Sequence, residues 1–365
     1  MQISRSLQNG ADSIDVGLGQ RESIPSHILT AHDAVGGVLS ADINGKTAIT
    51  LISQSLDGEE AVALSWNAID SELTEQEETN LSQETKRLVE QEIGVENVET
   101  VPTNESREYL DIQNTMAEAW SSTGIGEAEL IPTYEFEAKD RGGNLIVSET
   151  DGISSLAYMF PDMTQDNVLY SHAVGSDSHS AGAGLEIKKQ QREKAAKHSY
   201  DTIYWTVDPL KPVNNRLNLT KLGGVASEYK EDVYDTETSG GTPADRFVIE
   251  WRIDSSRAED KLNATESQGK DYLSDIRQDE TDIVLSADGA LPNSDFGEER
   301  EELEGQVGVE IPEQAVEDMS DEVEEEWRYA TRTVLGSLMD QGYEVTELMR
   351  PGENGFEQNT YILED

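Results

Sequence analysis

The chain of 365 residues carries 75 acidic and 27 basic side chains, a formal net charge of −48, and has no cysteine. Disulfides, zinc–thiolate sites and cysteine nucleophiles are therefore excluded. So acidic a surface also repels nucleic acid and anionic membranes. The length is enough for two domains of ordinary size.

The acidity has two explanations, which are intrinsic disorder and a folded protein adapted to multimolar salt. Hydrophobic residues make up 35% of the chain and occur in ordered clusters, such as residues 48–52, while the acids are spread along most of its length. This favours a folded, halophilic protein. No apolar run approaches the ~18 residues that span a bilayer, and residues 1–20 lack a basic start followed by an apolar core. We therefore expect a cytoplasmic protein.

In chain order, the sequence first predicts a short helix from residue 23 and two strands at 38–43 and 47–53. Asn44-Gly45 between these strands is a strong hairpin signal. A third strand is expected at 61–69 and an acidic helix at 73–92. Gly94 ends that helix, and a short strand follows at 95–101. The helix has an inner stripe made of Leu81, Thr85, Leu88 and Val89.

A similar pattern recurs about a hundred residues later and predicts a divergent duplication of a helix–strand–strand–strand–helix–strand unit. The alternative is that two ordinary segments share turn chemistry by chance. Ile131-Pro132 and Asp140 match Ile24-Pro25 and Asp33 at an offset of 107 residues, and Asp151-Gly152 takes the place of Asn44-Gly45. Gly142-Gly143 matches Gly36-Gly37 with a slip of one residue, and residues 168–171 match 62–65.

The remaining chain predicts a loop-rich polar segment at 255–304, with one strand at 281–286, and a long amphipathic helix at 313–341. The other expected elements are a strand at 202–207, a helix at 213–222, a strand at 246–253 and a closing strand pair at 343–348 and 359–363.

The stretch from Ser178 to Lys189 follows an apolar strand and opens a helix, with glycines at 182 and 184. Glycines let backbone N–H groups approach an anion, and the helix start adds a partial positive charge. Residues 184–222 also form a basic island, which favours a phosphate-bearing ligand over a salt-bridged helix face. Its eight cations are Lys188, Lys189, Arg192, Lys194, Lys197, Lys211, Arg216 and Lys221, against the four acids Glu186, Glu193, Asp201 and Asp208.

Several strings resemble a family of acetyltransferases of the GNAT superfamily, of halophilic archaeal type. They are Gln191-Arg192-Glu193, YDTIYWTVDPL (200–210), Asn214 and Asn218 followed by Lys221-Leu222-Gly223, PADRFVIEW (243–251), VEIP (309–312), Trp327-Arg328, Thr331-Arg332 and Gly342-Tyr343. The family pattern has a Trp-Thr-x-Asp-Pro-Leu strand end and an Asp-Arg-x-x-x-Glu-Trp strand. The likeness covers about residues 105–365.

The resemblance implies an α/β mixed (α+β) fold with a mixed central sheet, in which two parallel strands, 168–174 and 202–207, splay apart. It implies acetyl-CoA as acyl-CoA co-substrate, with the pyrophosphate on the loop and helix start and with Asn214 near the pantetheine. Carried across, the cofactor-binding residues are Ala173, Val174, His179, Ser180, Ala181, Gly182, Ala183, Gly184 and Asn214. The loop has His179 and Ser180 where the family has Arg and Gly, so one phosphate-pairing cation is missing.

For catalysis, an amine needs a proton acceptor with a pKa near neutral. His172 is the first candidate, and the alternative is a structural histidine. Asp208 and Glu250 match family positions, although Asp208 before a proline can cap a turn and Glu250 can pair with Arg246 or Arg252. The tyrosine that serves many GNAT enzymes as general acid is replaced by Leu219. The histidines lack carboxylate partners at metal-ligand spacing, so no metal is proposed.

The sequence thus predicts a degenerate GNAT-like half-copy at 1–104, an acyltransferase domain at 105–254 and an extension at 255–365. The expected function is transfer of an acyl group, most simply acetyl, to an amine of a small molecule or peptide. The alternatives are a catalytically degenerate acyl-CoA-binding or scaffold protein and a purely structural acidic protein.

Overall fold

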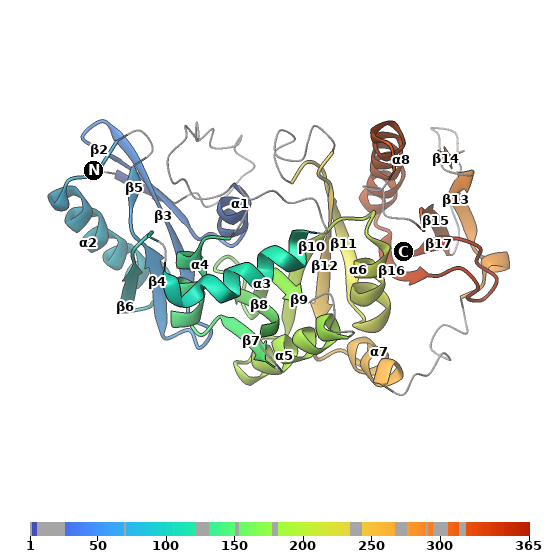
Figure 1. Cartoon of the computed structure of the whole chain (residues 1–365), viewed down its shortest axis with the longest axis horizontal. Coiled ribbons are helices and arrows are strands. Elements are labelled where there is room, and N and C mark those ends of the chain that lie inside the picture. The colour runs from blue at the N-terminus through green and yellow to red at the C-terminus, as the bar shows by residue number, and fades with distance from the viewer. Residues whose placement is uncertain are drawn as a thin grey trace. The chain divides into compact units, whose positions relative to one another are not determined.

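The computed structural model has a mixed α/β fold with mixed sheets, which confirms the predicted fold class (Figure 1). It divides into two compact units, Met1–Tyr200 and Asp201–Asp365, and each is described by itself. The structure describes residues 2–5, 26–68, 71–104, 106–121, 131–149, 153–176, 182–233, 243–266, 276–288, 291–294, 306–313 and 319–365. The domain boundaries at 104 and 254 stay predictions.

The first half of the first unit is a sheet in the order β1-β2-β3-β4-β6, with β5 paired to β3. Its strands are antiparallel except for β4 and β6, which are parallel. The hairpin at Asn44-Gly45 is confirmed, because both residues have positive φ, as its turn requires. The elements are β1 (Gln2–Arg5), α1 (Ser26–Ala34), β2 (Val38–Ile43), β3 (Lys46–Gln54), β4 (Glu60–Leu64), β5 (Asn67–Ala68), α2 (Glu75–Glu92) and β6 (Asn97–Val101).

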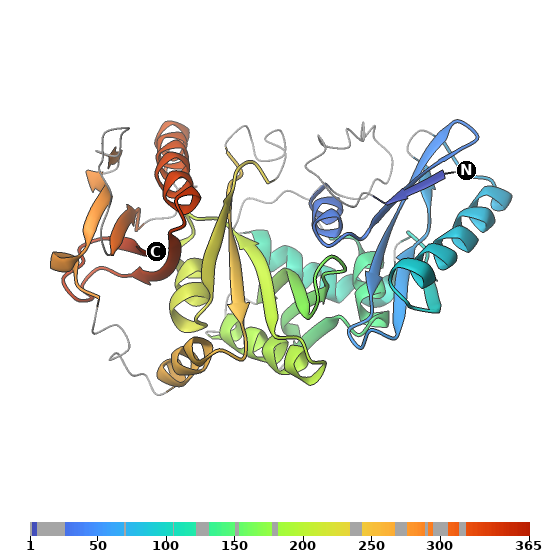
Figure 2. The ribbon, with the colours of Figure 1, turned by 180° about the vertical axis from the view of Figure 1, so that it is seen from behind.

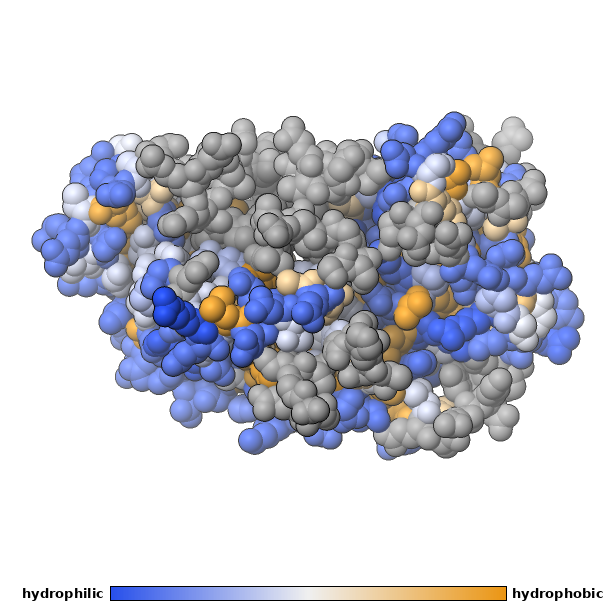
Figure 3. All heavy atoms as spheres, in the orientation of Figure 1, coloured by the Kyte–Doolittle hydropathy of each residue, from blue (hydrophilic) through white to orange (hydrophobic). Residues whose placement is uncertain are grey.

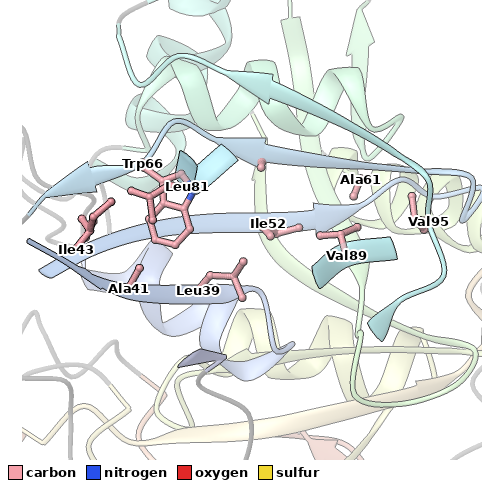
Figure 4. Close-up of a cluster of buried hydrophobic side chains, with 11 residues drawn as sticks. Leu39, Ala41, Ile43, Ile52, Ala61, Trp66, Leu81, Val89 and Val95 are labelled. Atoms are coloured by element: carbon pink, nitrogen blue, oxygen red, sulfur yellow. The ribbon is translucent and has the colours of Figure 1, made fainter. Parts of the chain in front are cut away.

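Helix α2 covers one face of this sheet (Figure 2). Leu81 and Val89 of the helix pack against Leu39, Ile52 and Trp66 of the strand region, and these side chains are nearly all buried (Figure 4). The stripe repeats every four residues because that spacing keeps side chains on one helix face. The predicted helix is therefore confirmed. Of its predicted inner stripe, Leu81, Thr85 and Val89 are buried, whereas Leu88 is half-buried.

The second half of the first unit is an antiparallel meander β7-β8-β9. Helices α3 and α4 pack on β8, and α5 packs on β8 and β9. The elements are η1 (Arg107–Tyr109), α3 (Leu110–Ser121), α4 (Thr133–Arg141), β7 (Leu145–Glu149), β8 (Ile153–Pro161), β9 (Val168–Ser176) and α5 (Ala183–Lys197).

The two halves of this unit share backbone geometry at a constant offset of 107 residues. Strand β3 spans 46–54 and β8 spans 153–161. The N–H of Gly36 donates to Asp33 O, and that of Gly143 donates to Asp140 O. Gly36 and Gly143 have φ values of 70° and 68°. They are therefore the matched pair, and the predicted one-residue slip between the glycine pairs is wrong.

The match between the third strands also needs correction. Gln54 of β3 pairs with Ala61, and the equivalent Pro161 of β8 pairs with Leu169. The ladders thus align residue 61 with 169, an offset of 108, whereas the sequence match of 62–65 with 168–171 implies 106. The turn before the third strand is one residue longer in the second half, so a constant offset fails there.

Reciprocal hydrogen bonds join the two halves. Leu56 N–H donates to Gly142 O over 3.0 Å, and Met163 N–H donates to Val35 O over 3.1 Å. Both partners differ by the same 107 residues, so each half offers the same donor and acceptor to the other. Such mutual contacts are those of a two-fold related pair.

The second unit is built on a sheet in the order β14-β13-β15-β17-β16-β11-β12-β10. Its strands are antiparallel except for β13 and β15, which are parallel. Strand β9 belongs to the first unit and β10 to the second, so the expected splay between them stays a prediction. The elements are β10 (Thr202–Val207), α6 (Pro212–Asn215), η3 (Arg216–Lys221), β11 (Val225–Lys230), β12 (Arg246–Arg252), α7 (Ser256–Glu266), η5 (Gln278–Glu280), β13 (Asp282–Asp288), β14 (Leu291–Ser294), β15 (Val307–Ile311), α8 (Asp321–Asp340), β16 (Glu344–Met349) and β17 (Asn359–Glu364).

Three expectations for the second unit are corrected. The segment expected to be loop-rich contains helix α7, which buries Ala258 and Leu262. Helix α8 begins at Asp321 after Ser320, not at residue 313. The expected helix at 213–222 is a short α-helix followed by η3, a π-helix.

Hydrophilic side chains cover most of the described surface on the face in Figure 3. Within the described parts of the chain, none of the helices combines the length and the apolar character needed to cross a bilayer.

Candidate functional site

The start of α5 has the backbone expected of an anion-binding turn. Gly182 precedes the helix with φ +89°, a left-handed conformation that side chains rarely adopt. It is exposed, and a Cβ added there would meet no atom within 4 Å. The N–H groups of Ala183 and Gly184 lie in the first turn, where no earlier carbonyl of the helix can accept them. His179, Ser180 and Ala181 lie outside the described residues.

Strand β9 contains a bulge beside this helix. Tyr158 pairs with Ala173 and Met159 with Ser171, so His172 is the extra residue. Bulges re-aim side chains and recur next to active sites. His172 is half-buried, and its ring lies 5.4 Å from that of Tyr158 and 5.9 Å from that of Tyr170.

The two other predicted residues of β9 surround this bulge. Ala173 is buried, and Val174 is half-buried. The carbonyl of Val174 accepts a hydrogen bond from Trp120 Nε1 of α3 over 3.2 Å. The bulge thus determines the direction in which the side chain of His172 leaves the strand. The sequence gives no sign of this bulge.

A buried polar group connects α5 to β9. Lys188 Nζ lies 3.2 Å from Ser171 Oγ, to which Gln191 Nε2 donates over 2.9 Å. Lys188 is 4% exposed, and burial lowers its pKa to about 7. The sequence analysis counts Lys188 as part of the basic island. In the structure its amino group lies inside the protein and not on the surface.

The basic island divides between the two units. Lys188 and Lys194 lie in the first unit, where Lys194 donates to Leu145 O. Arg216 and Lys221 lie in the second. A single phosphate-facing patch therefore stays a prediction.

Asp208 lies in the turn after β10. Its Oδ1 accepts from Leu210 N over 2.8 Å, and its Oδ2 lies 3.3 Å from Arg328 Nη2. The side chain is 11% exposed. These contacts are those of a turn cap held by an ion pair.

Glu250 and Asn214 lie elsewhere in the second unit. Glu250 of β12 pairs with Arg252 over 2.7 Å, and Asn214 is exposed at the start of α6. Leu219, at the position where the sequence resemblance leads one to expect a tyrosine, is fully buried in η3. A π-helix often marks a functional segment, and nothing in the sequence signals it here.

A buried charged group at the junction of the two predicted half-copies was not foreseen. We call His32, Glu135 and Lys139 the Glu135 cluster. Glu135 Oε1 lies 2.9 Å from His32 Nε2 and 3.1 Å from Lys139 Nζ. All three side chains are at most 2% exposed, and Lys139 Nζ also lies 4.0 Å from the centre of the Phe160 ring.

Within the Glu135 cluster, the charges of Glu135 and Lys139 support each other. Burial opposes the ionisation of Glu135, but the positive charge of Lys139 and the neighbouring His32 hold its pKa below its usual range. Burial lowers the pKa of His32 and of Lys139. His32 and Lys139 are themselves separated by 107 residues, so the cluster lies where the two matching helices α1 and α4 meet.

No family model matches the chain, and no curated protein matches it in sequence. Solved structures similar to it are N-acetyltransferases of 10–16% identity. The ribosomal-protein-S18-alanine N-acetyltransferase of Escherichia coli is 12% identical, with a TM-score of 0.33, over 42% of this chain and 92% of its own.

Two further solved structures give the same picture. An N-acetyltransferase of Staphylococcus aureus is 16% identical, with a TM-score of 0.33, over 40% of this chain and 94% of its own. Diaminobutyrate acetyltransferase of Paenibacillus lautus, solved with L-2,4-diaminobutyric acid and coenzyme A, is 16% identical, with a TM-score of 0.33, over 42% and 93%.

Proposed function

We propose that the chain is an acyl-CoA-dependent N-acyltransferase of the GNAT type, which transfers an acetyl group to an amine of a small molecule or peptide. The observation that carries the proposal is the start of α5. An exposed glycine with φ +89° and open space around it precedes a 15-residue helix that follows directly on the bulged strand β9. Backbone N–H groups and the helix dipole at such a start favour a phosphate group.

The residues fit acyl-CoA in this arrangement. Gly182, Ala183 and Gly184 would hold the pyrophosphate with their backbone N–H groups, and His179, Ser180 and Ala181 belong to the same predicted loop. Ala173 and Val174 of β9 and Asn214 of α6 stay predicted contacts of the cofactor. Acetyl-CoA supplies the activated acyl group. His172 would accept the proton of the attacking amine at an imidazole nitrogen, the step that a base with a near-neutral pKa performs best.

The other two predicted acid–base residues have weaker support. Asp208 is engaged by Leu210 N and Arg328, and Glu250 by Arg252. Both are better explained by structural roles, so His172 is the proposed base.

The second candidate is an acyl-CoA-binding protein without turnover. It is favoured by one observation, the fully buried Leu219 at the position where many GNAT enzymes have their tyrosine acid. Without an acid, the departing thiolate is not protonated by the protein, although a thiolate is itself a tolerable leaving group because its pKa is low.

Calorimetric titration with acetyl-CoA in molar KCl tests the proposal. The parent should bind, and Gly182→Asp should abolish binding, because it adds bulk and a negative charge that faces a phosphate. Gly94→Asp is the matched control: Gly94 has φ +77°, and an added Cβ would likewise meet nothing within 4 Å. If both variants bind like the parent, the proposed site is wrong. If the parent binds but acetylates no amine, the second candidate replaces the first.

A further inference from the structure

Five cations line one strand of the second unit. Arg257 and Lys261 of α7 both contact Glu347 of β16, and Arg257 also donates to Thr346 O. Arg216 at the start of η3 donates to Leu348 O and pairs with Glu353 over 2.7 Å. Lys221 ends η3, and Arg350 directly follows β16. Only two acids, Glu347 and Glu353, have ion pairs with this group among the described residues.

Hydrogen bonds of Glu353 and Thr220 connect the segments that contain Arg216, Lys221 and Arg350. Glu353 accepts from Arg216 with one carboxylate oxygen and from Arg350 N, over 2.9 Å, with the other. Thr220, next to Lys221, accepts a hydrogen bond from Leu348 N over 3.2 Å. Since Thr220 precedes Lys221 and Leu348 is two residues before Arg350, the C-terminal ends of η3 and β16 lie side by side.

Among the described residues, the charges of Arg216, Lys221 and Arg350 are not balanced by ion pairs. Arg257 and Lys261 share Glu347, and Arg216 has Glu353. Over the described part of the chain, neither the ammonium of Lys221 nor the guanidinium of Arg350 has an ion pair. Burial and then the charges of Arg350 and Arg216 lower the pKa of Lys221, the direction expected for an amine near like charges. In a chain of 75 acids and 27 bases, such a surplus is unexpected unless something negative relieves it.

We propose that Arg216, Lys221 and Arg350, here called the Lys221 site, bind a phosphate-bearing anion. Arginine forks match phosphate oxygens in pairs, and the lysine supplies a compact point charge. Arg216 is 6% exposed and fixed by Leu348 O and Glu353, so it is preorganised. Lys221 is half-buried and Arg350 exposed, so both can reach a ligand from solution.

The test is the melting temperature of the full chain as phosphate replaces chloride at constant ionic strength. Lys221→Gln and Arg350→Gln should each raise the phosphate concentration at half-effect about tenfold or more, the loss expected for one charged hydrogen bond. Arg350→Lys should recover part of it. Lys230→Gln is the matched control, because Lys230 is 47% exposed and the substitution removes one cation from the same unit. Arg216 is left unchanged, because its buried contacts would confound folding.

The control separates the site from the general effect of phosphate. Phosphate stabilises most proteins by exclusion from their surface, and that part should be the same in the parent, Lys230→Gln and the two site variants. A parent that responds no more than Lys221→Gln overturns the proposal.

Two further titrations, with coenzyme A and with 3′-dephospho-coenzyme A, identify the source of the phosphate. If Lys221→Gln weakens the binding of coenzyme A but not that of 3′-dephospho-coenzyme A, the site binds the 3′-phosphate of the co-substrate. An effect of inorganic phosphate alone assigns it to a separate anion. Gly182→Asp should leave the inorganic phosphate response intact, so a failure of the proposed acyltransferase function is distinguishable from a failure of the Lys221 site.

Discussion

The two predicted half-copies in the first unit differ most at the starts of α2 and α5. Helix α2 has a complete capping box: Thr74 Oγ1 accepts from Glu77 N, and Glu77 Oε2 accepts from Thr74 N over 2.8 Å. Lys46 and Asn44 also donate to the Glu77 carboxylate. Helix α5 instead begins at Gly182, which has no side chain to cap it.

This difference shows how one unit can serve two purposes. In α2 an internal carboxylate occupies the place where an anion would bind, so the free helix N–H groups are satisfied by the protein itself. At the start of α5 the N-cap residue makes no such side-chain hydrogen bond, and this is where we propose that the ligand binds. The first half-copy therefore resembles a structural partner, and the second is the half proposed to bind acyl-CoA. The four predictions below test this division, from the largest expected effect to the smallest.

The bulge provides the first test. His172 is the extra residue of β9, whereas residues 52–54 of β3 pair with residues 61–63 of β4 without a shift. His172→Ala should lower the acetylation rate about 10²- to 10⁴-fold, the range for a lost general base, and should leave acetyl-CoA affinity unchanged. The pH–rate profile of the variant should also lack the limb that the titration of His172 gives to the profile of the parent. A variant with the parent's rate would assign His172 a structural role.

The Glu135 cluster tests how firmly the half-copies are joined. Glu135→Leu leaves Lys139 and His32 buried without their carboxylate and should destabilise the protein by about 3–5 kcal/mol. The double variant Glu135→Leu/Lys139→Met should recover most of this loss, because no isolated charge remains. Denaturant unfolding at pH 7 in molar KCl measures both. A double variant as unstable as the single one would mean that packing, and not charge, dominates at this junction.

These two sites also show the limits of the sequence. The hairpin at Asn44-Gly45 and the stripe of α2 were predictable because turn chemistry and the spacing of apolar residues are local. The Glu135 cluster was not, because His32 and Glu135 are 103 residues apart and charged side chains normally indicate a surface. Helix α7 was missed for a similar reason, since its sequence, Ser256–Glu266, is polar and only Ala258 and Leu262 mark an inner face.

For the candidate site, the sequence located the glycines and the histidine but not their geometry. A bulge leaves no pattern in the sequence. That His172 is the extra residue of β9 is therefore seen only in the pairing of β8 with β9. The basic island is visible in the sequence because so acidic a chain has few cations elsewhere. Composition alone, however, does not separate the buried Lys188 from the half-buried Lys221.

Lys188 gives the third test. The buried faces of α2 and α5 are alike in spacing, but that of α5 also contains this cation. Helix α2 buries Leu81, Thr85 and Val89, and α5 buries Ile187, Gln191 and Ala195 at the same spacing. Burial lowers the pKa of Lys188 from 10.5 to about 7. Between these values the unfolded chain holds a proton that the folded chain gives up. The stability cost is therefore full below pH 7 and vanishes as the pH rises through about 10.5.

Lys188→Met should accordingly stabilise the protein at pH 7, on the order of 2–4 kcal/mol, and by much less at pH 10. Urea unfolding of parent and variant at both pH values gives the difference, in which all other titrating groups cancel. If the variant is less stable at pH 7, the hydrogen bond to Ser171 outweighs the cost of burying the amine. The comparison of α2 with α5 would then concern packing and not charge.

The smallest effect is expected at the closed helix start. Thr74→Ala removes the hydroxyl that accepts from Glu77 N and should cost about 1 kcal/mol of stability, with acetyl-CoA affinity unchanged. Lys46, then Thr74 N and Asn44, hold the pKa of Glu77 at about 2. The Glu77 carboxylate therefore stays ionised in the folded chain as the pH falls below the 4.5 of an ordinary glutamate. Its contribution to stability is complete above that pH, declines as the pH falls from 4.5, and is gone at about pH 2. The cost of Thr74→Ala, measured by thermal unfolding in molar KCl, should thus be equal at pH 7 and pH 5. A change in acetyl-CoA binding would mean that the first half-copy also takes part in the site, and the division between a closed and an open helix start would fail.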